Sequence, residues 1–128
     1  MSAPKIMVVD DDPHSREIVR AYLESRGYTV VVAKQGEEAV SLLAEVQPAI
    51  VLLDVMMPGM DGWEVARMIR SHPACSETRV IMLTARSDYV DEDAQLRAGA
   101  HDYLVKPVRL EELAGHVQRN LAARERSS

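Results

Sequence analysis

Acidic residues and one lysine follow short apolar runs of the sequence, at the points where those runs stop. Three consecutive aspartates, residues 10–12, close the first run, and Asp54 closes the third run, which reads IVLLD. The fourth run ends at Thr84 and the fifth at Lys106. A carboxylate inside a strand that is buried on both faces would cost desolvation free energy. Asp54 is therefore expected at the end of a strand, where it can act chemically.

If these runs are parallel strands, their carboxyl ends meet at one edge of the sheet and bring the polar side chains together. Carboxylates about 4 Å apart repel by roughly 4 kcal/mol per pair at an effective dielectric constant near 20. A bound divalent cation would offset that repulsion. Because only oxygen ligands are available, we expect Mg²⁺, with Mn²⁺ as the alternative. Magnesium sites commonly include phosphoryl oxygens, so the pattern favours phosphoryl chemistry.

The elements that must position these residues alternate along the chain. Segments with the apolar spacing of helices separate the runs, including one that Asp61 can cap and that extends through Arg70, and a last one from residue 109 to 121. Strict alternation with continuous apolar strands predicts a doubly wound α/β fold, with helices on both faces of a parallel sheet. The predicted strands cover residues 5–10, 29–33, 49–54, 79–84 and 101–106.

The composition is that of one ordinary globular domain. The 128 residues are 47% hydrophobic and 27% charged, which predicts a domain at residues 1–123 and a frayed tail or start of a linker at 124–128. A net charge of −5 argues against direct binding to nucleic acid. The single Cys75 suits a reducing compartment, and no run approaches the roughly 18 apolar residues of a membrane span. A cytoplasmic location without membrane contact is expected.

Taken together, the motifs resemble those of the receiver domains of two-component response regulators. That family has an acidic pair after the first strand, Asp after the third, Thr-Ala after the fourth and Lys-Pro after the fifth. The matching segments here are VVDDD, LLDVMMPGMDG, MLTAR and LVKP, and the resemblance covers nearly the whole chain. It implies a flavodoxin-like sheet of five parallel strands in the order 2-1-3-4-5, with five helices.

The resemblance implies that Asp54 is a phosphoacceptor for the phosphohistidine of a sensor histidine kinase or a histidine phosphotransfer protein. An Asp carboxylate, with an ordinary pKa near 3.9, needs no general base to attack at neutral pH. Lys106 is expected to contact the phosphoryl oxygens, and Thr84 to donate its hydroxyl to them. The chain would then be no enzyme beyond catalysing its own phosphorylation and dephosphorylation.

The resemblance also implies a set of ligands for Mg²⁺. Asp11 and Asp54 are expected to bind the metal directly, Asp10 through water and Met56 through its backbone carbonyl. Asp12 falls one place beyond the acidic pair of the family. It is expected to cap the following helix instead.

Two further features of the site are implied by the family. Met56 and Arg86 would flank the path of the water that hydrolyses the phosphoryl group, and an apolar Met56 predicts slow self-hydrolysis. The Lys106–Pro107 peptide is expected to be cis, although cis accounts for only about 5–6% of X-Pro bonds in folded proteins.

Thr84 and Tyr103 are expected to couple phosphorylation of Asp54 to a change at the protein surface. When Thr84 moves to the phosphoryl group, Tyr103 would turn inward and reshape the surface of the fourth helix, fifth strand and fifth helix. That surface would then favour an output partner or a second copy of the chain. The alternative for Tyr103 is a static amphipathic side chain at the sheet edge.

Other functions fit the residues less well. A small Mg²⁺-dependent phosphohydrolase with an Asp nucleophile would need a second Asp where Met56 stands. A flavodoxin-like mononucleotide binder would need a Gly-rich or Ser/Thr-rich phosphate loop in place of DDDPHS. The output stays open between a stand-alone regulator and part of a larger transcription factor, cyclase or hybrid kinase. His116 stands where receivers joined to winged-helix domains are expected to carry Arg, which favours another output. The histidines lack metal-ligand spacing and are expected to have surface roles.

Overall fold

The computed structural model describes residues 4–85 and 99–127 of the chain. Residues 86–98, where the fourth helix and Arg86 were expected, lie outside that part. In chain order the elements are β1 (Lys5–Val9), α1 (Pro13–Ser25), β2 (Thr29–Ala33), α2 (Gly36–Val46), β3 (Ile50–Asp54), α3 (Gly62–Ser71), a short 3₁₀ helix η1 (Pro73–Cys75), β4 (Arg79–Thr84), β5 (Asp102–Val105) and α5 (Leu110–Ser127).

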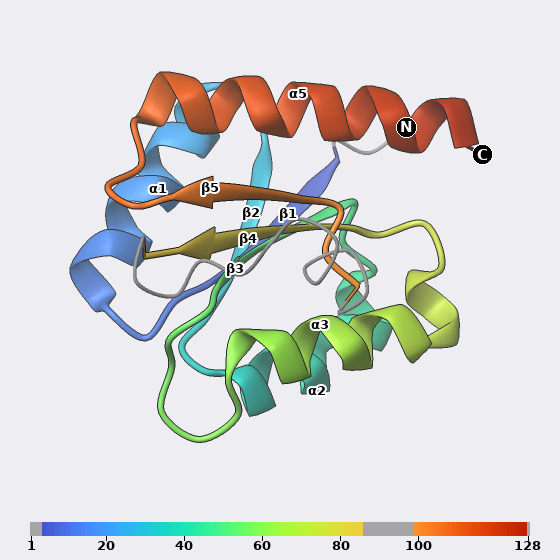
Figure 1. Ribbon diagram of the computed structural model, residues 1–128. Helices are drawn as coiled ribbons and strands as arrows, with labels where there is room; N and C mark the ends of the chain where they lie inside the picture. Colours follow the sequence, from blue (N-terminus) through green and yellow to red (C-terminus); the bar gives the residue numbers. More distant parts are fainter. Residues whose placement is uncertain (1–3, 86–98, 128) are drawn as a thin grey trace.

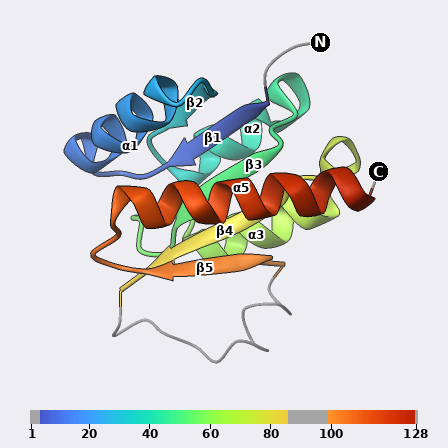
Figure 2. The same cartoon turned by 90° about the horizontal axis from the view of Figure 1, so that it is seen from above.

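The five strands form one parallel sheet in the order β2-β1-β3-β4-β5. Helices α1 and α5 cover one face of the sheet, and α2 and α3 cover the other (Figure 1). The view from above shows α5 crossing over the central strands (Figure 2). The predicted doubly wound fold and strand order are confirmed.

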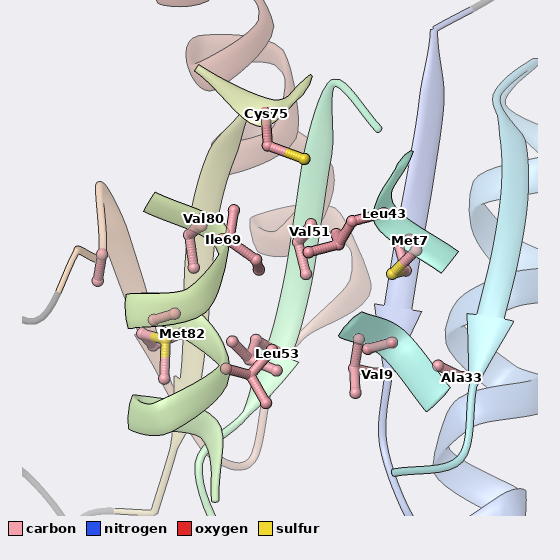
Figure 3. Close-up of a cluster of buried hydrophobic side chains, with 14 of the residues drawn as sticks. Met7, Val9, Ala33, Leu43, Val51, Leu53, Ile69, Cys75, Val80 and Met82 are labelled. Carbon is pink, nitrogen blue, oxygen red and sulfur yellow. The ribbon is translucent and has the colours of Figure 1, made fainter. Parts of the chain in front are cut away.

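The apolar strands are continuous because both faces of the sheet are buried. Alternate side chains of a strand point to opposite faces, so each strand supplies two separate cores. Figure 3 shows the core under α2 and α3, where strand side chains meet Leu43 and Ile69. The strand residues in that core include Met7, Val9, Val51, Leu53, Val80 and Met82. Their neighbours fill the core under α1 and α5, namely Ile6, Val8, Ile50, Leu52, Ile81 and Leu83.

Local hydrogen bonds begin two of the helices where the sequence predicts. Asp12 caps α1 by accepting a hydrogen bond of 3.0 Å from the backbone N–H of His14, as predicted. Asp61 caps α3 in the same way through the N–H of Glu64, also at 3.0 Å. Gly27 follows α1 with a φ of +92°, a conformation that glycine adopts without strain. The two N-caps set where the loops at the carboxyl edge of the sheet end and the helices begin.

The last helix is longer than the range 109–121 predicted for it. It continues to Ser127 and therefore includes residues 124–127, which were expected as a frayed tail or linker. The extension consists mostly of strong helix formers, and Arg124 and Arg126 lie in the last turn, where positive charge complements the helix dipole. Within the described ranges, neither this helix nor another combines the length and apolar character that a membrane span requires.

Candidate functional site

The carboxyl ends of the strands bring the predicted site residues to one edge of the sheet. Asp10 and Asp11 follow β1, Asp54 is the last residue of β3, and Thr84 is the last residue of β4. Lys106 follows β5 directly. Since all neighbouring strands pair in parallel, these five residues come from loops and strand ends on the same side of the molecule (Figure 2).

Three carboxylates form a cluster at this edge. One oxygen each of Asp10, Asp11 and Asp54 lies within 4.8 Å of the others, and it is the one group of three potential metal ligands of the Asp, Glu, His and Cys types among the described residues. Asp10 and Asp54 are 5% and 4% exposed, whereas Asp11 is exposed. A set of oxygen ligands open on one side suits Mg²⁺, which keeps part of its water shell when it binds to proteins.

The pKa of Asp10 shows that burial and neighbouring negative charges disfavour its ionised form. Burial raises the pKa of Asp10 above its ordinary value, and the negative charges of Asp54 and Asp11 act in the same direction. The hydrogen bond of 3.0 Å from the N–H of Asp12 and the positive charge of Lys106 lower the pKa but do not cancel the effect of burial. A cation at this site would favour the ionised form of Asp10.

Lys106 forms an ion pair with the predicted phosphoacceptor. Its Nζ lies 2.8 Å from Oδ1 of Asp54, whose side chain is 6% exposed. The backbone N–H of Met56 donates a longer hydrogen bond of 3.3 Å to the same oxygen. The role of the Met56 carbonyl as a metal ligand stays a prediction. The peptide between Lys106 and Pro107 is cis, as predicted.

Asp11 and Asp12 differ in what their carboxylates contact. Asp12 accepts hydrogen bonds from the N–H of His14 at 3.0 Å and the hydroxyl of Ser15 at 2.9 Å. These bonds lower the pKa of Asp12, the Ser15 bond having the larger effect. Within the described part of the chain, no hydrogen bond to the Asp11 carboxylate is found. The geometry thus puts Asp11 in the carboxylate cluster and Asp12 in the helix cap.

The two predicted switch residues lie on neighbouring strands. Thr84 is 1% exposed, and its hydroxyl donates a hydrogen bond of 3.1 Å to the carbonyl oxygen of Ala85. Tyr103 is half-buried in β5, in register with Met82 of β4, and packs against the core under α2 and α3. Their movement on phosphorylation stays a prediction, as does the role of Arg86, which lies outside the described residues.

A groove of about 570 Å³ opens beside the carboxylate cluster. Its walls come from α1, the loop after β5 and the first turns of α5, and are mostly apolar. Ile18 of α1 is 44% exposed in it, and Asp10 and Lys106 reach it from the site. The groove therefore places an apolar surface next to Asp10 and Lys106 of the site.

Several residues outside the predicted site have clear structural roles. Arg16 of α1 donates a hydrogen bond of 2.8 Å from Nη1 to the backbone carbonyl oxygen of Asp10. Two histidines expected to have surface roles, His101 and His116, are half-buried and hydrogen-bonded at the amino ends of β4 and β5. Trp63 of α3 packs against the core beneath it. No motif marks these positions, because each contact joins different secondary-structure elements.

Comparison with known proteins places the chain among signalling domains. A family model described as the response regulator receiver domain matches residues 6–118. The DNA-binding response regulator MtrA of Mycolicibacterium smegmatis is 40% identical over 121 residues, which cover 94% of this chain and 52% of that protein. The response regulator MprA of Mycolicibacterium vanbaalenii is 46% identical over 114 residues, covering 89% and 48%. The chain spans about half the length of these two relatives.

Solved structures of receiver and chemotaxis proteins have the same fold as this chain and a similar length. The receiver domain of a signal transduction histidine kinase from Syntrophus aciditrophicus is 34% identical, with a TM-score of 0.83 and coverage of 94% of this chain and 92% of that one. The chemotaxis protein CheY4 of Vibrio cholerae is 30% identical, with a TM-score of 0.83 and coverage of 92% and 98%. The chain belongs to the response regulator receiver domain family, whose members are phosphoacceptors in two-component signalling.

Proposed function

We propose that this receiver accepts a phosphoryl group on Asp54 from the phosphohistidine of a sensor histidine kinase or a histidine phosphotransfer protein. The observation that carries the proposal is the distance of 2.8 Å between Lys106 Nζ and Asp54 Oδ1 beside a cluster of three carboxylates. It supports phosphoryl transfer because a nucleophilic oxygen and a cation that can neutralise phosphoryl charge are adjacent.

The reaction needs no base to remove a proton from the nucleophile. An oxygen of the ionised Asp54 carboxylate attacks phosphorus, the bond between phosphorus and the histidine nitrogen breaks, and the imidazole leaves with the electron pair of that bond. The product is an acyl phosphate on Asp54. The ammonium group of Lys106 then contacts the phosphoryl oxygens in place of the carboxylate.

The acidic residues fit a magnesium site. Asp11 and Asp54 would bind Mg²⁺ directly, Asp10 through water and Met56 through its carbonyl, and the same oxygen ligands would accept Mn²⁺. When bound, Mg²⁺ neutralises negative charge on the transferring phosphoryl group. Asp10 and Asp11 keep two further negative charges beside Asp54, so a phosphoryl group is expected to enter only with a cation.

The apolar groove supports docking of a protein phosphodonor. It lies next to the phosphoacceptor, because its lining includes Asp10 and Lys106, the residue that pairs with Asp54, and it exposes Ile18 on α1. We infer that a kinase or phosphotransfer protein lays an apolar helix face against α1 and the start of α5. The location of such an encounter is proposed to be the cytoplasm.

The output is proposed to be a phosphorylation-dependent partner or a homodimer. The similarity to MtrA, a DNA-binding response regulator, also supports control of a DNA-binding domain in a longer protein. With a net charge of −5, the chain itself is not built to bind nucleic acid. Sequencing the full open reading frame would separate these outputs.

The test is phosphorylation by a small phosphodonor such as acetyl phosphate with Mg²⁺. Mass spectrometry should find an acid-stable, base-labile acyl phosphate on Asp54, and Asp54→Asn should abolish it. Asp12→Asn is the matched control, because Asp12 belongs to the helix cap. Full phosphorylation of Asp54→Asn, or of wild type without a divalent metal, would contradict the proposal.

A further inference from the structure

Arg16 differs from the other arginine in the middle of α1 by what it contacts. Its Nη1 donates a hydrogen bond of 2.8 Å to the carbonyl oxygen of Asp10, and no carboxylate among the described residues forms a salt bridge with it. Arg20, about one turn later on the helix, instead forms ion pairs with Glu17 and Glu24. Arg16 is half-buried and turns back from the helix towards the acidic site.

Asp10 is held through each of its polar groups. Its N–H donates to the carbonyl oxygen of Ala33 at 3.2 Å, and its Oδ1 accepts from the N–H of Asp12 at 3.0 Å. The remaining group, the carbonyl oxygen, accepts from Arg16. Because β1 ends at Val9, no strand continues to supply a ladder partner for that oxygen, and the guanidinium takes this role.

The carbonyl of Asp10 belongs to the peptide that joins Asp10 to Asp11. A peptide unit is planar, so fixing its oxygen also restrains the nitrogen and Cα of Asp11. The Asp11 carboxylate is exposed and, within residues 4–85 and 99–127, has no hydrogen bond of its own. The bond from Arg16 is therefore a restraint on the direction of Asp11.

We propose that Arg16 is a positioning residue that orients the Asp10–Asp11 peptide and so places the Asp11 carboxylate for cation binding. The inference rests on the proposed magnesium site. Two effects of Arg16 oppose each other: its positive charge disfavours a nearby cation, whereas its hydrogen bond organises the ligands. Removing the side chain therefore strengthens Mg²⁺ binding if charge dominates and weakens it if positioning dominates.

The experiment compares Arg16→Met, which removes the donor and the charge but keeps the apolar stem, with Arg16→Lys, which keeps both a charge and a donor. Arg20→Met is the matched control on the same helix. Isothermal titration with MgCl₂ should show a dissociation constant about tenfold higher in Arg16→Met, the scale expected for a group that orients a metal ligand. Arg16→Lys should recover part of the loss, and Arg20→Met should match wild type.

A second readout separates positioning from general loss of structure. The amide resonance of Asp11 should shift in Arg16→Met without Mg²⁺, while the core amides of β3 keep their wild-type positions. Phosphorylation by acetyl phosphate should recover to within about twofold of wild type at saturating Mg²⁺, because the metal can still be driven onto its ligands.

Unchanged or tighter Mg²⁺ binding in Arg16→Met would overturn the role of Arg16. If Arg16→Met unfolds, an equal loss of Mg²⁺ affinity in the folded Arg16→Lys and Arg20→Met variants would overturn it too. Failure of wild type to become phosphorylated would count against the proposed function alone, since the metal titration tests Arg16 independently.

Discussion

Asp54 combines near-complete burial with a charged partner. Its side chain is 6% exposed and lies 2.8 Å from Lys106 Nζ. The Lys106 side chain is 38% exposed, so water partly screens the attraction between the two charges. A phosphoryl group on Asp54 would take over the lysine as its own partner. We expect this arrangement to favour an incoming phosphoryl group.

Asp11 and Asp12 provide a test of the metal site at this scale. We expect Asp11→Ala to weaken Mg²⁺ binding by about tenfold or more, because it removes one negative charge beside the cation. Asp12→Ala should change the affinity little, since that carboxylate is committed to the helix cap. Calorimetric titration measures both. Equal losses would show that the ligands are assigned wrongly.

Met56 is expected to set the lifetime of the phosphorylated state. It is 62% exposed, two residues beyond Asp54, and its thioether cannot orient an attacking water. Met56→Asn should speed the decay of phospho-Asp54 by roughly fivefold, the equivalent of one neutral hydrogen bond of about 1 kcal/mol. Met68→Asn, on the exposed methionine of α3, is the control. The same decay rate in both variants would refute the role of Met56.

His101 predicts a dependence of stability on pH. Burial lowers the pKa of His101 to about 4, and the charges of Arg79 and Arg70 act in the same direction. Its Nδ1 accepts a hydrogen bond of 3.0 Å from the N–H of Val80, which requires the neutral ring. The unfolded chain, with the ordinary pKa of 6.5, binds a proton first as the pH falls. The stabilisation is thus complete above pH 6.5 and is lost towards pH 4.

Urea unfolding between pH 6.5 and pH 4 should show that the free energy of unfolding falls by roughly 1–2 kcal/mol. This figure allows for the partial exposure of the His101 ring. His101→Asn should have a flatter pH profile between the two pKa values than wild type. Parallel profiles would mean that other groups cause the acid sensitivity.

At the scale of elements, the joint between β3 and α3 positions the phosphoacceptor. Gly62 begins α3, and its N–H donates to the carbonyl oxygen of Val55 at 3.0 Å. A Cβ on Gly62 would lie 2.5 Å from the carbonyl oxygen of Asp54 and 2.8 Å from Cα of Val55. Both contacts are with backbone atoms, which cannot turn aside as a side chain can. The helix start and the strand end are therefore in close contact at Asp54.

Gly62→Ala should lower the free energy of unfolding by about 1–3 kcal/mol through this overlap, and should slow phosphorylation of Asp54. Gly115→Ala is the matched control, because Gly115 lies in α5 and a Cβ there meets nothing within 4 Å. That change should stabilise the protein by roughly 0.5–1 kcal/mol. Chemical denaturation measures both, and stabilisation by Gly62→Ala would contradict the tight joint.

A second joint ties α5 to the sheet at the opposite edge. Asn120 is 3% exposed, and its Nδ2 donates to Asp102 Oδ2 at 2.9 Å, while its Oδ1 accepts from Arg79 Nε at 3.2 Å. Nδ1 of His116 lies 2.7 Å from the same Asp102 oxygen. Asp102 and His116 are therefore hydrogen-bonded to each other within the chain. They lie on β5 and α5, two of the elements whose surface was predicted to change on phosphorylation.

At the scale of the whole molecule, phosphorylation matters only if some surface differs between the two states. The hydroxyl of Thr84 now bonds to the carbonyl oxygen of Ala85, so donation to a phosphoryl group on Asp54 would require that bond to break. Movement at the end of β4 would shift β5, because the two strands are paired in the sheet. Tyr103 lies on β5. The proposed coupling thus runs from Asp54 through Thr84 to β5 and α5.

Thr84→Ala tests this coupling. Self-association or partner binding, measured with and without a beryllofluoride phosphoryl mimic, should change in wild type and change little in Thr84→Ala. Thr84→Ser keeps the hydroxyl and should retain most of the response. A tenfold change in affinity corresponds to about 1.4 kcal/mol of difference between the states. A full response in Thr84→Ala would show that the coupling runs elsewhere.

Local features of this protein were determined by the sequence itself. Apolar runs closed by Asp54 and Lys106 predict strands that end at the site, and Asp12 and Asp61 predict the helix starts. Such features depend on neighbouring residues, so composition and spacing reveal them. The motifs at the ends of four strands carried the resemblance to the receiver family, and that resemblance implied the strand order. The end of α5 was missed because good helix formers continue beyond the last predicted core contact.

Only the tertiary structure decided which of these groups meet. Lys106 and Asp54 are 52 positions apart in the chain, yet their charged atoms are 2.8 Å apart because β5, β4 and β3 are neighbours in the sheet. Likewise, the bonds of Arg16 to the Asp10 carbonyl and of His101 to Val80 depend on how a side chain turns after its element has packed. Local propensity sets the element, but the free energy of such a contact depends on burial and on partners from elsewhere in the chain.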